Sequence, residues 1–206
     1  VGLFRMTEDG LAEVTDPSAL FLVHREEGLP PGVAVAPVFE GSRVLLVEIQ
    51  ALVVPAKGGI SRIYSDRIDS GRAARVAAVL EKHLGARFSE LDLYVNVAGG
   101  IRIAEVGVEL PLALALYSAK VGVPLPERLA VTGEGSLAGE VRPVSGIEKR
   151  LRACQEMGFT QLIGPLARSD GPGAKRQALL EGLAPVAHVR DAVKKAFGGT
   201  PKGGAV

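Results

Sequence analysis

The chain has 206 residues, of which 47% are hydrophobic and 23% charged, and its formal net charge is +1. This length and composition predict a soluble globular protein with one substantial core, or one domain with an appendage. Its single cysteine, Cys154, excludes an internal disulfide framework, and with only three histidines it argues against a metal site. No apolar run reaches the length of about 18 residues that a membrane helix needs, so we expect a cytoplasmic protein with no membrane partner.

Charge is distributed unevenly along the chain. Residues 1–30 hold two basic and six acidic residues, whereas residues 57–87 hold seven basic and three acidic ones. Such asymmetry in a near-neutral chain indicates a localised basic surface, although a solvated face of paired charges would look the same.

The first third of the chain predicts mainly strands. Residues 1–22 fit a strand and a short helix beginning near Asp16-Pro17-Ser18. Two apolar runs, Val33–Phe39 and Arg43–Val54, are separated by Glu40-Gly41-Ser42 and predict a hairpin. A long irregular segment, Pro55–Ser70, follows, and segments of that length are often functional or disordered.

Gly71–Leu84 has the periodicity of an amphipathic helix, with Arg72, Arg75 and Lys82 opposite its apolar stripe. These cations are either an ordinary solvated face or a basic ridge beside the segment that carries Arg62 and Arg67.

The remainder predicts alternating strands and helices. A capping box, Ser145-x-x-Glu148, should open the helix that ends at Gly158. The other expected strands are Leu91–Val97, Leu129–Thr132, Ser136–Val141, Gln161–Gly164 and Val186–Val189. The other expected helices are Glu109–Val121, Gly173–Glu181 and Asp191–Phe197. The last residues, Gly198–Val206, are expected to form a disordered tail.

No phosphate-binding loop of the GxxxxGK[ST] type is present. Gly133-Glu134-Gly135-Ser136 is too short and lacks the lysine, and Gly99-Gly100 is better explained as a turn. We therefore expect no ATP site in this chain.

The runs Gly99–Leu116 and Val131–Pro165 resemble the two halves of a Lon proteolytic domain. The resemblance implies an α/β (α+β) fold of the Lon proteolytic-domain-like, ribosomal S5 domain 2-like type. Where that family keeps a catalytic serine and lysine, this chain has Gly107 and Arg150. Glycine has no hydroxyl and a guanidinium stays protonated, so the dyad is expected to be inactive, with Ser118 or Ser136 left as remote alternatives.

One branch of the superfamily matches more closely. Arg43–Pro55, Tyr94–Gly100 and Gly139–Leu151 resemble the C-terminal domain of the RadA (Sms) family of bacterial DNA-repair ATPases, although the GEVRPV motif also occurs in magnesium-chelatase-like competence proteins. The resemblance implies three parts: residues 1–30 as the tail of a RecA-like ATPase domain and linker, 31–197 as the Lon-protease-like domain, and 198–206 as the tail. A departure is Ser61-Arg62-Ile63, where two adjacent arginines are more typical.

The family implies an ATP-driven hexameric motor that binds single-stranded and branched DNA and performs branch migration with the RecA recombinase, in the cytoplasm at the nucleoid. ATP, magnesium and zinc would belong to the missing N-terminal part, and this fragment would supply DNA contact and ring assembly. The expected DNA-contacting residues are Arg62, Arg67, Arg72, Arg75, Lys82, Arg102, Arg142, Lys149, Arg150 and Arg152.

Backbone contact by these cations is the preferred mode, with Tyr64 the one candidate for base stacking. Two alternatives stay open. The chain could be a purely structural ring former without DNA contact, or it could retain peptidase activity.

Overall fold

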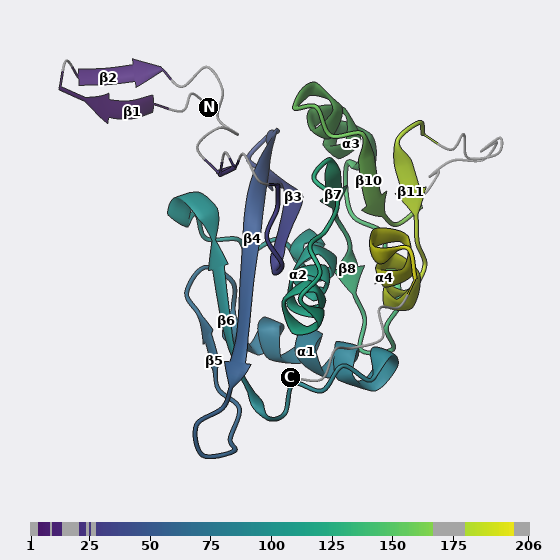
Figure 1. Ribbon diagram of the computed structural model, residues 1–206. Coiled ribbons are helices and arrows are strands. Elements are labelled where there is room, and N and C mark those ends of the chain that lie inside the picture. Colours follow the sequence, from purple (N-terminus) through teal and green to yellow (C-terminus); the bar gives the residue numbers. More distant parts are fainter. Residues whose placement is uncertain are drawn as a thin grey trace.

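The structure is a computed structural model that describes residues 4–8, 10–13, 21–23, 25, 28–166 and 180–199 (Figure 1). Its centre is a seven-stranded mixed sheet with the order β11-β10-β7-β3-β4-β6-β5. The β3–β4 and β4–β6 pairs are antiparallel, and the other neighbours are parallel. The strands are β3 (Val33–Glu40), β4 (Arg43–Pro55), β5 (Ile63–Ser65), β6 (Leu91–Val97), β7 (Leu129–Val131), β10 (Gln161–Gly164) and β11 (Leu183–Pro185). The expected α/β class is confirmed.

Helices cover the two faces of this sheet unequally. One face packs against α1 (Ser70–Leu84), α2 (Glu109–Val121) and α4 (Val189–Phe197), and the other carries only α3 (Ile147–Glu156) among the described residues (Figure 1). Alternation along β4 separates two cores: Leu45 and Val47 face the three-helix side, whereas Leu46 faces α3. Because α3 is short, it leaves the β4–β6–β5 end of its face uncovered.

The predicted strands before Pro55, the strands Leu91–Val97 and Gln161–Gly164, and the helices α1 and α2 are confirmed within a residue or two. Asp69 caps α1, its carboxylate accepting a 2.8 Å hydrogen bond from the backbone N–H of Arg72. The last strand is shifted from Val186–Val189 to β11, and α4 begins two residues earlier than expected, at Val189.

The expectation of a strand over Ser136–Val141 was wrong. Two short strands, β8 (Glu134–Gly135) and β9 (Val141–Arg142), pair with each other, and residues 136–140 form the turn between them. The Ser136 N–H donates to the Glu140 carbonyl at 2.9 Å, which closes the turn. The segment expected to be irregular, Pro55–Ser70, in turn contains β5.

The capping box at the start of α3 was also wrong. Gly146 occupies the N-cap position with φ 64°, and no side chain caps the helix. This left-handed conformation is open to glycine at little cost, so the chain enters α3 through backbone geometry. The Ser145 carbonyl instead accepts a 2.9 Å hydrogen bond from Arg150 Nε.

The N-terminal part contains a hairpin of β1 (Phe4–Thr7) and β2 (Gly10–Glu13). The helix expected near Asp16, nearly all of the helix expected over Gly173–Glu181, and the tail beyond residue 199 lie outside the described residues. The expected division of the chain into residues 1–30, 31–197 and 198–206 stays a prediction. Within the described part, no helix is both long and apolar enough to cross a membrane.

Candidate functional site

The two positions of the expected dyad meet in one hollow. Gly107 lies in the 3₁₀ turn Val106–Val108 directly before α2, and Arg150 lies on α3 on the opposite side. Both line a hollow of about 500 Å³ together with Phe39 and Glu105. The fold therefore brings together the two positions that the sequence resemblance singled out.

The guanidinium group of Arg150 contacts protein groups through all of its nitrogen atoms and through its carbon atom. Its Nη2 lies 2.6 Å from Glu105 Oε1, its Nη1 donates to the Pro37 carbonyl at 2.5 Å, and its Cζ lies 4.6 Å from the centre of the Phe39 ring. The side chain is only 2% exposed. It can therefore neither accept a proton nor reach a DNA phosphate in this conformation.

Gly107 is packed against the same carboxylate. A Cβ atom built on this glycine would lie 2.4 Å from Glu105 Oε1. The Glu105 carboxylate thus fills the space that a serine side chain would need, and an internal Glu105–Arg150 ion pair stands where a nucleophile and base would act.

The two alternative nucleophiles have structural partners. Ser118 Oγ accepts the Gly32 N–H at 2.9 Å and donates to the Val123 carbonyl at 2.5 Å. Ser136 Oγ lies 3.2 Å from Glu140 Oε2 and accepts the Glu140 N–H. Both hydroxyls are therefore engaged in contacts within the protein.

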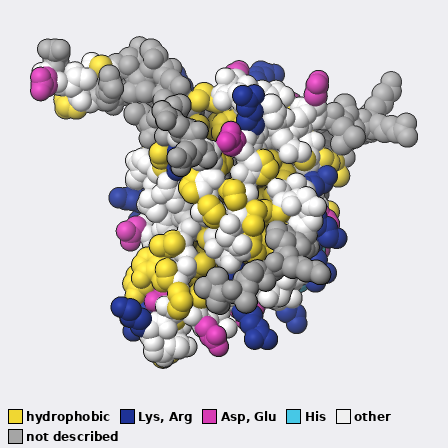
Figure 2. Space-filling view, in the orientation of Figure 1, with side chains coloured by type: hydrophobic (Ala, Val, Ile, Leu, Met, Phe, Trp, Pro, Cys, Tyr) yellow, Lys and Arg dark blue, Asp and Glu magenta, His cyan; other side chains and the backbone are white. Residues whose placement is uncertain are grey.

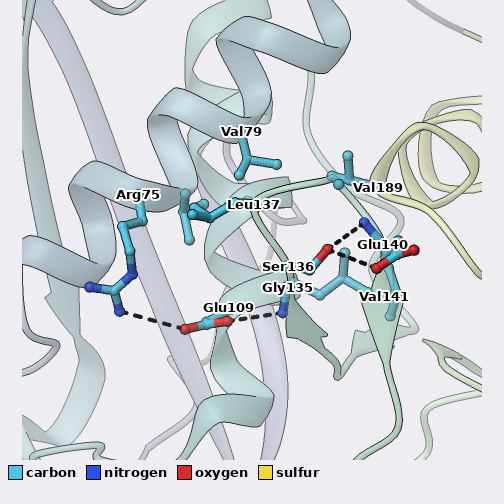
Figure 3. A pocket seen from close by; sticks show the side chains of 13 residues that line it. Arg75, Val79, Glu109, Gly135, Ser136, Leu137, Glu140, Val141 and Val189 are labelled. Atoms are coloured by element: carbon cyan, nitrogen blue, oxygen red, sulfur yellow. Dashed lines mark hydrogen bonds and ion pairs between the residues drawn. The ribbon is translucent and has the colours of Figure 1, made fainter.

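Ser136 also lines a small cavity between α1 and the β8–β9 turn (Figure 3). Glu109 lies at its edge, 4.0 Å from Arg75 and accepting the Gly135 N–H at 2.9 Å. The remaining wall is mainly apolar, with Val79, Leu137, Val141 and Val189 among its residues. At about 90 Å³ this cavity is far smaller than the roughly 300 Å³ at which small-molecule pockets begin.

Three of the expected DNA-contacting cations come from neighbouring segments. Arg62 and Arg67 flank β5, and Arg102 lies beside Arg67 because the Ile103 N–H donates to the Arg67 carbonyl at 2.9 Å. All three side chains are exposed. We call Arg62, Arg67 and Arg102 the β5 cluster.

Arg72 behaves differently from its neighbours on α1. Its guanidinium donates to the carbonyls of Ala104 and Glu105 at 3.0 and 2.9 Å, and its Nε lies 3.4 Å from Glu109. With 13% of its side chain exposed, Arg72 fastens the segment 101–106 to α1. Arg75 and Lys82 on the same helix are exposed.

A second group of cations borders a separate hollow. Lys149 and Arg152 on α3 line a space of about 350 Å³ together with Arg43 at the start of β4. Sequence reasoning missed Arg43, because no local pattern links a hairpin residue to a helix more than a hundred positions away. Arg142 is 57% exposed and lies 3.7 Å from Glu134. On the face shown in Figure 2, Lys and Arg side chains stand at separate places and form no continuous patch.

Tyr64 has an aromatic partner that the sequence did not reveal. Its ring stacks on that of Tyr94 with centroids 4.7 Å apart and planes 12° from parallel. Both tyrosines are exposed. A side-chain hydrogen bond to Tyr64 is the main cause that raises the pKa of Arg62 above its ordinary value. The sequence signal that could have pointed to this partner is that Tyr94 lies at an outward-facing position of the predicted strand Leu91–Val97.

Comparison with known proteins finds one matching family profile and several similar curated proteins. The sequence profile of the family described as subunit ChlI of Mg-chelatase matches residues 68–168. Curated relatives named DNA repair protein RadA are 50% identical over 166 residues in Treponema pallidum, 42% over 167 in Escherichia coli and 37% over 199 in Bacillus subtilis. These alignments cover 81%, 81% and 97% of this chain.

The chain belongs to the RadA family. It spans about a third to two fifths of the length of these relatives, since the alignments cover 36%, 36% and 43% of them. The ChlI match agrees with the expected sharing of motifs between the two groups.

Proposed function

We propose that this chain acts in DNA repair as the DNA-binding and assembly domain of a RadA-type protein. The observation that carries the proposal is the β5 cluster: three exposed arginines from two chain segments in a family whose relatives are named for DNA repair. Arginines that contact phosphates bind without reading sequence, so affinity should fall steeply as salt rises.

The structure narrows the set of candidate contacts. Arg72 and Arg150 are engaged inside the protein and are left out of the proposed interface. The set that remains accessible is Arg62, Arg67, Arg75, Lys82, Arg102, Arg142, Lys149 and Arg152, to which we add Arg43.

The domain is proposed to lack peptidase activity. Gly107 offers no nucleophile, and Arg150 is bound to Glu105 and cannot take up a proton. Incubation with unfolded casein should leave the substrate intact over the time in which an active protease digests it. Digestion that survives Ser136→Ala would assign the activity to another residue or a contaminant.

Ring assembly and the wider partners are proposed on the family resemblance. A hexameric ring would arrange several β5 clusters around single-stranded or branched DNA, and work with the RecA recombinase and hydrolysis of ATP would belong to the assembled, longer protein. A ring former without DNA contact is the competing function.

Charge reversal of the β5 cluster tests DNA contact. Arg62→Glu/Arg67→Glu should weaken binding to a dye-labelled single strand by about tenfold or more, because each contact adds to the phosphate attraction. Lys194→Glu/Lys195→Glu on α4 changes the charge equally at exposed positions of another element and should have a smaller effect. Unchanged binding by the first variant, with both variants melting like the parent, would remove the β5 cluster from the interface.

A further inference from the structure

The uncovered end of the sheet carries a row of apolar and aromatic side chains. Leu52, Tyr94 and Tyr64 are direct neighbours across β4, β6 and β5. Their relative exposures are 57%, 40% and 43%. Figure 2 shows hydrophobic side chains gathered at the lower left, over these three strands. We call Leu52, Tyr94 and Tyr64 the aromatic row.

Part of this sheet face is covered. Leu46 packs under α3, and Glu48 is 1% exposed because Arg25 and the backbone N–H of Val23 bind its carboxylate. The aromatic row begins where this cover ends. Large side chains left exposed in a contiguous group usually mark an interaction site.

We infer that the aromatic row is a stacking platform for the bases of single-stranded nucleic acid, beside the arginines that hold its phosphates. The inference rests on the proposed function and extends it from backbone attraction to contact with bases. Every base has a flat π-face, so stacking on tyrosine favours unpaired bases without selecting a sequence.

The arrangement of the two tyrosines suits this role. They already stack with nearly parallel planes, and Tyr64 lies on β5, the last strand of the sheet. The outer side of Tyr64 therefore faces the sheet edge, where no further strand pairs among the residues that the structure describes. Cross-strand packing between the rings fixes their orientation before any ligand arrives.

The charges around the row favour a polyanion over a second copy of this chain. Arg62 shares the face of Tyr64 two positions away, and Arg67 follows β5. Asp92 on the same face is only 8% exposed and accepts the Arg62 N–H at 2.9 Å, which leaves Asp66 as the exposed acid next to β5. Beyond the row, Asn96 and Gln50 form a polar pair at 3.2 Å.

The test compares two strands of about 12 nucleotides, one of thymidines and one an abasic sugar–phosphate chain of equal charge. The parent should bind the thymidine strand about tenfold more tightly, as one or two stacked bases would give. Tyr64→Leu/Tyr94→Leu should bind both strands equally, at the parent's abasic affinity. Tyr64→Phe/Tyr94→Phe keeps the rings and should keep the preference.

Tyrosine emission gives an independent readout because the chain has no tryptophan and only three tyrosines, of which Tyr117 is 3% exposed. The thymidine strand should quench the emission of the exposed pair, after correction for absorbed light, and the abasic strand should not. In Tyr64→Leu/Tyr94→Leu the remaining Tyr117 emission should not respond to either strand.

The outcomes separate this inference from the proposed function. Equal binding of both strands by the parent overturns stacking and leaves DNA binding in place, whereas binding of neither strand ends both proposals. Loss of self-association in Tyr64→Leu/Tyr94→Leu, with the base preference intact, would make the aromatic row an interface between copies and would also overturn stacking. A thermal melt of each variant shows whether the fold is retained.

Discussion

Arg150 is a charged residue whose side chain is almost fully buried. Glu105, two backbone carbonyls and the Phe39 ring together replace the water that its guanidinium loses on folding. A buried ion pair of this kind adds little net stability, yet removing one partner is costly because the other charge remains.

Arg150→Met should therefore lower the free energy of unfolding by about 3–5 kcal/mol. Arg152→Met changes an exposed arginine two positions later on the same helix and should cost less than about 0.5 kcal/mol. Urea denaturation of both variants gives the comparison. Similar stabilities for the two would show that the Arg150 contacts contribute little in solution.

The Cys154 thiol makes a pH-dependent contribution to the stability of the fold. Burial raises its pKa from 9.0 to about 12, and the nearby Arg150 charge opposes this effect only in part. The folded protein therefore keeps the thiol protonated at pH values where the unfolded chain ionises, so this contribution to stability is complete below pH 9 and is lost between pH 9 and about 12.

Cys154→Ala should accordingly lose stability less steeply than the parent as the pH rises from about 8 to 11. The readout is the change in unfolding free energy of each protein across this range, so that any constant cost of the smaller side chain cancels. Parallel curves for the two proteins would contradict the raised pKa of the buried thiol.

Among the secondary-structure elements, α1 has a second role besides core packing. Through Arg72 it fixes the carbonyls of Ala104 and Glu105, and this segment places the Glu105 carboxylate between Gly107 and Arg150. The Glu105 carboxylate is thus positioned by a helix that contributes neither Gly107 nor Arg150.

Arg72→Ala should loosen residues 101–106 while α1 stays folded, because two charge-assisted hydrogen bonds worth about 1.5–3 kcal/mol each are lost. Hydrogen exchange should show faster exchange at Ile103, whose N–H donates to the Arg67 carbonyl, with the α1 amides little changed. Arg75→Ala, an exposed arginine one turn later, serves as the control. Equal protection of the segment in both variants would show that other contacts hold it.

Features that depend on residues close together in the sequence could be predicted, whereas features that depend on residues far apart in the sequence could not. The limits of α2 were predictable because a proline tolerated in the first turn, Pro111, and a glycine that ends the helix, Gly122, are both local signals. The strand β5 was not, because its three residues gain a partner only through pairing with β6, some thirty positions away. The start of α3 was predicted wrongly because Ser145 is a residue type that caps helices. In the structure Gly146 occupies the N-cap position in a left-handed backbone conformation.

The candidate site divides in the same way. The family resemblance was enough to single out Gly107 and Arg150, and both line one hollow in the fold. The Glu105 carboxylate between them, the internal role of Arg72 and the proximity of Arg43 to α3 depend on side chains that meet only in three dimensions. No spacing rule reports such contacts.

At the scale of the whole molecule, assembly and DNA binding should respond differently to salt. With three phosphate contacts per site, raising salt from about 50 to 200 mM should lower affinity for a single strand about 20-fold. An assembly held by apolar contacts should change little over the same range. Sedimentation in the presence of labelled DNA should therefore show the strand released while the protein species keeps its sedimentation coefficient.

The slope of log affinity against log salt concentration measures how many phosphate contacts the protein makes. Arg62→Gln/Arg67→Gln should flatten the slope of log affinity against log salt by about 1.4, or 0.7 for each lost contact. Lys194→Gln/Lys195→Gln should leave it unchanged. If instead the protein species dissociates as salt rises and the slope of the first variant equals that of the parent, the exposed arginines pair with neighbouring subunits, and the chain acts as a ring former without direct DNA contact.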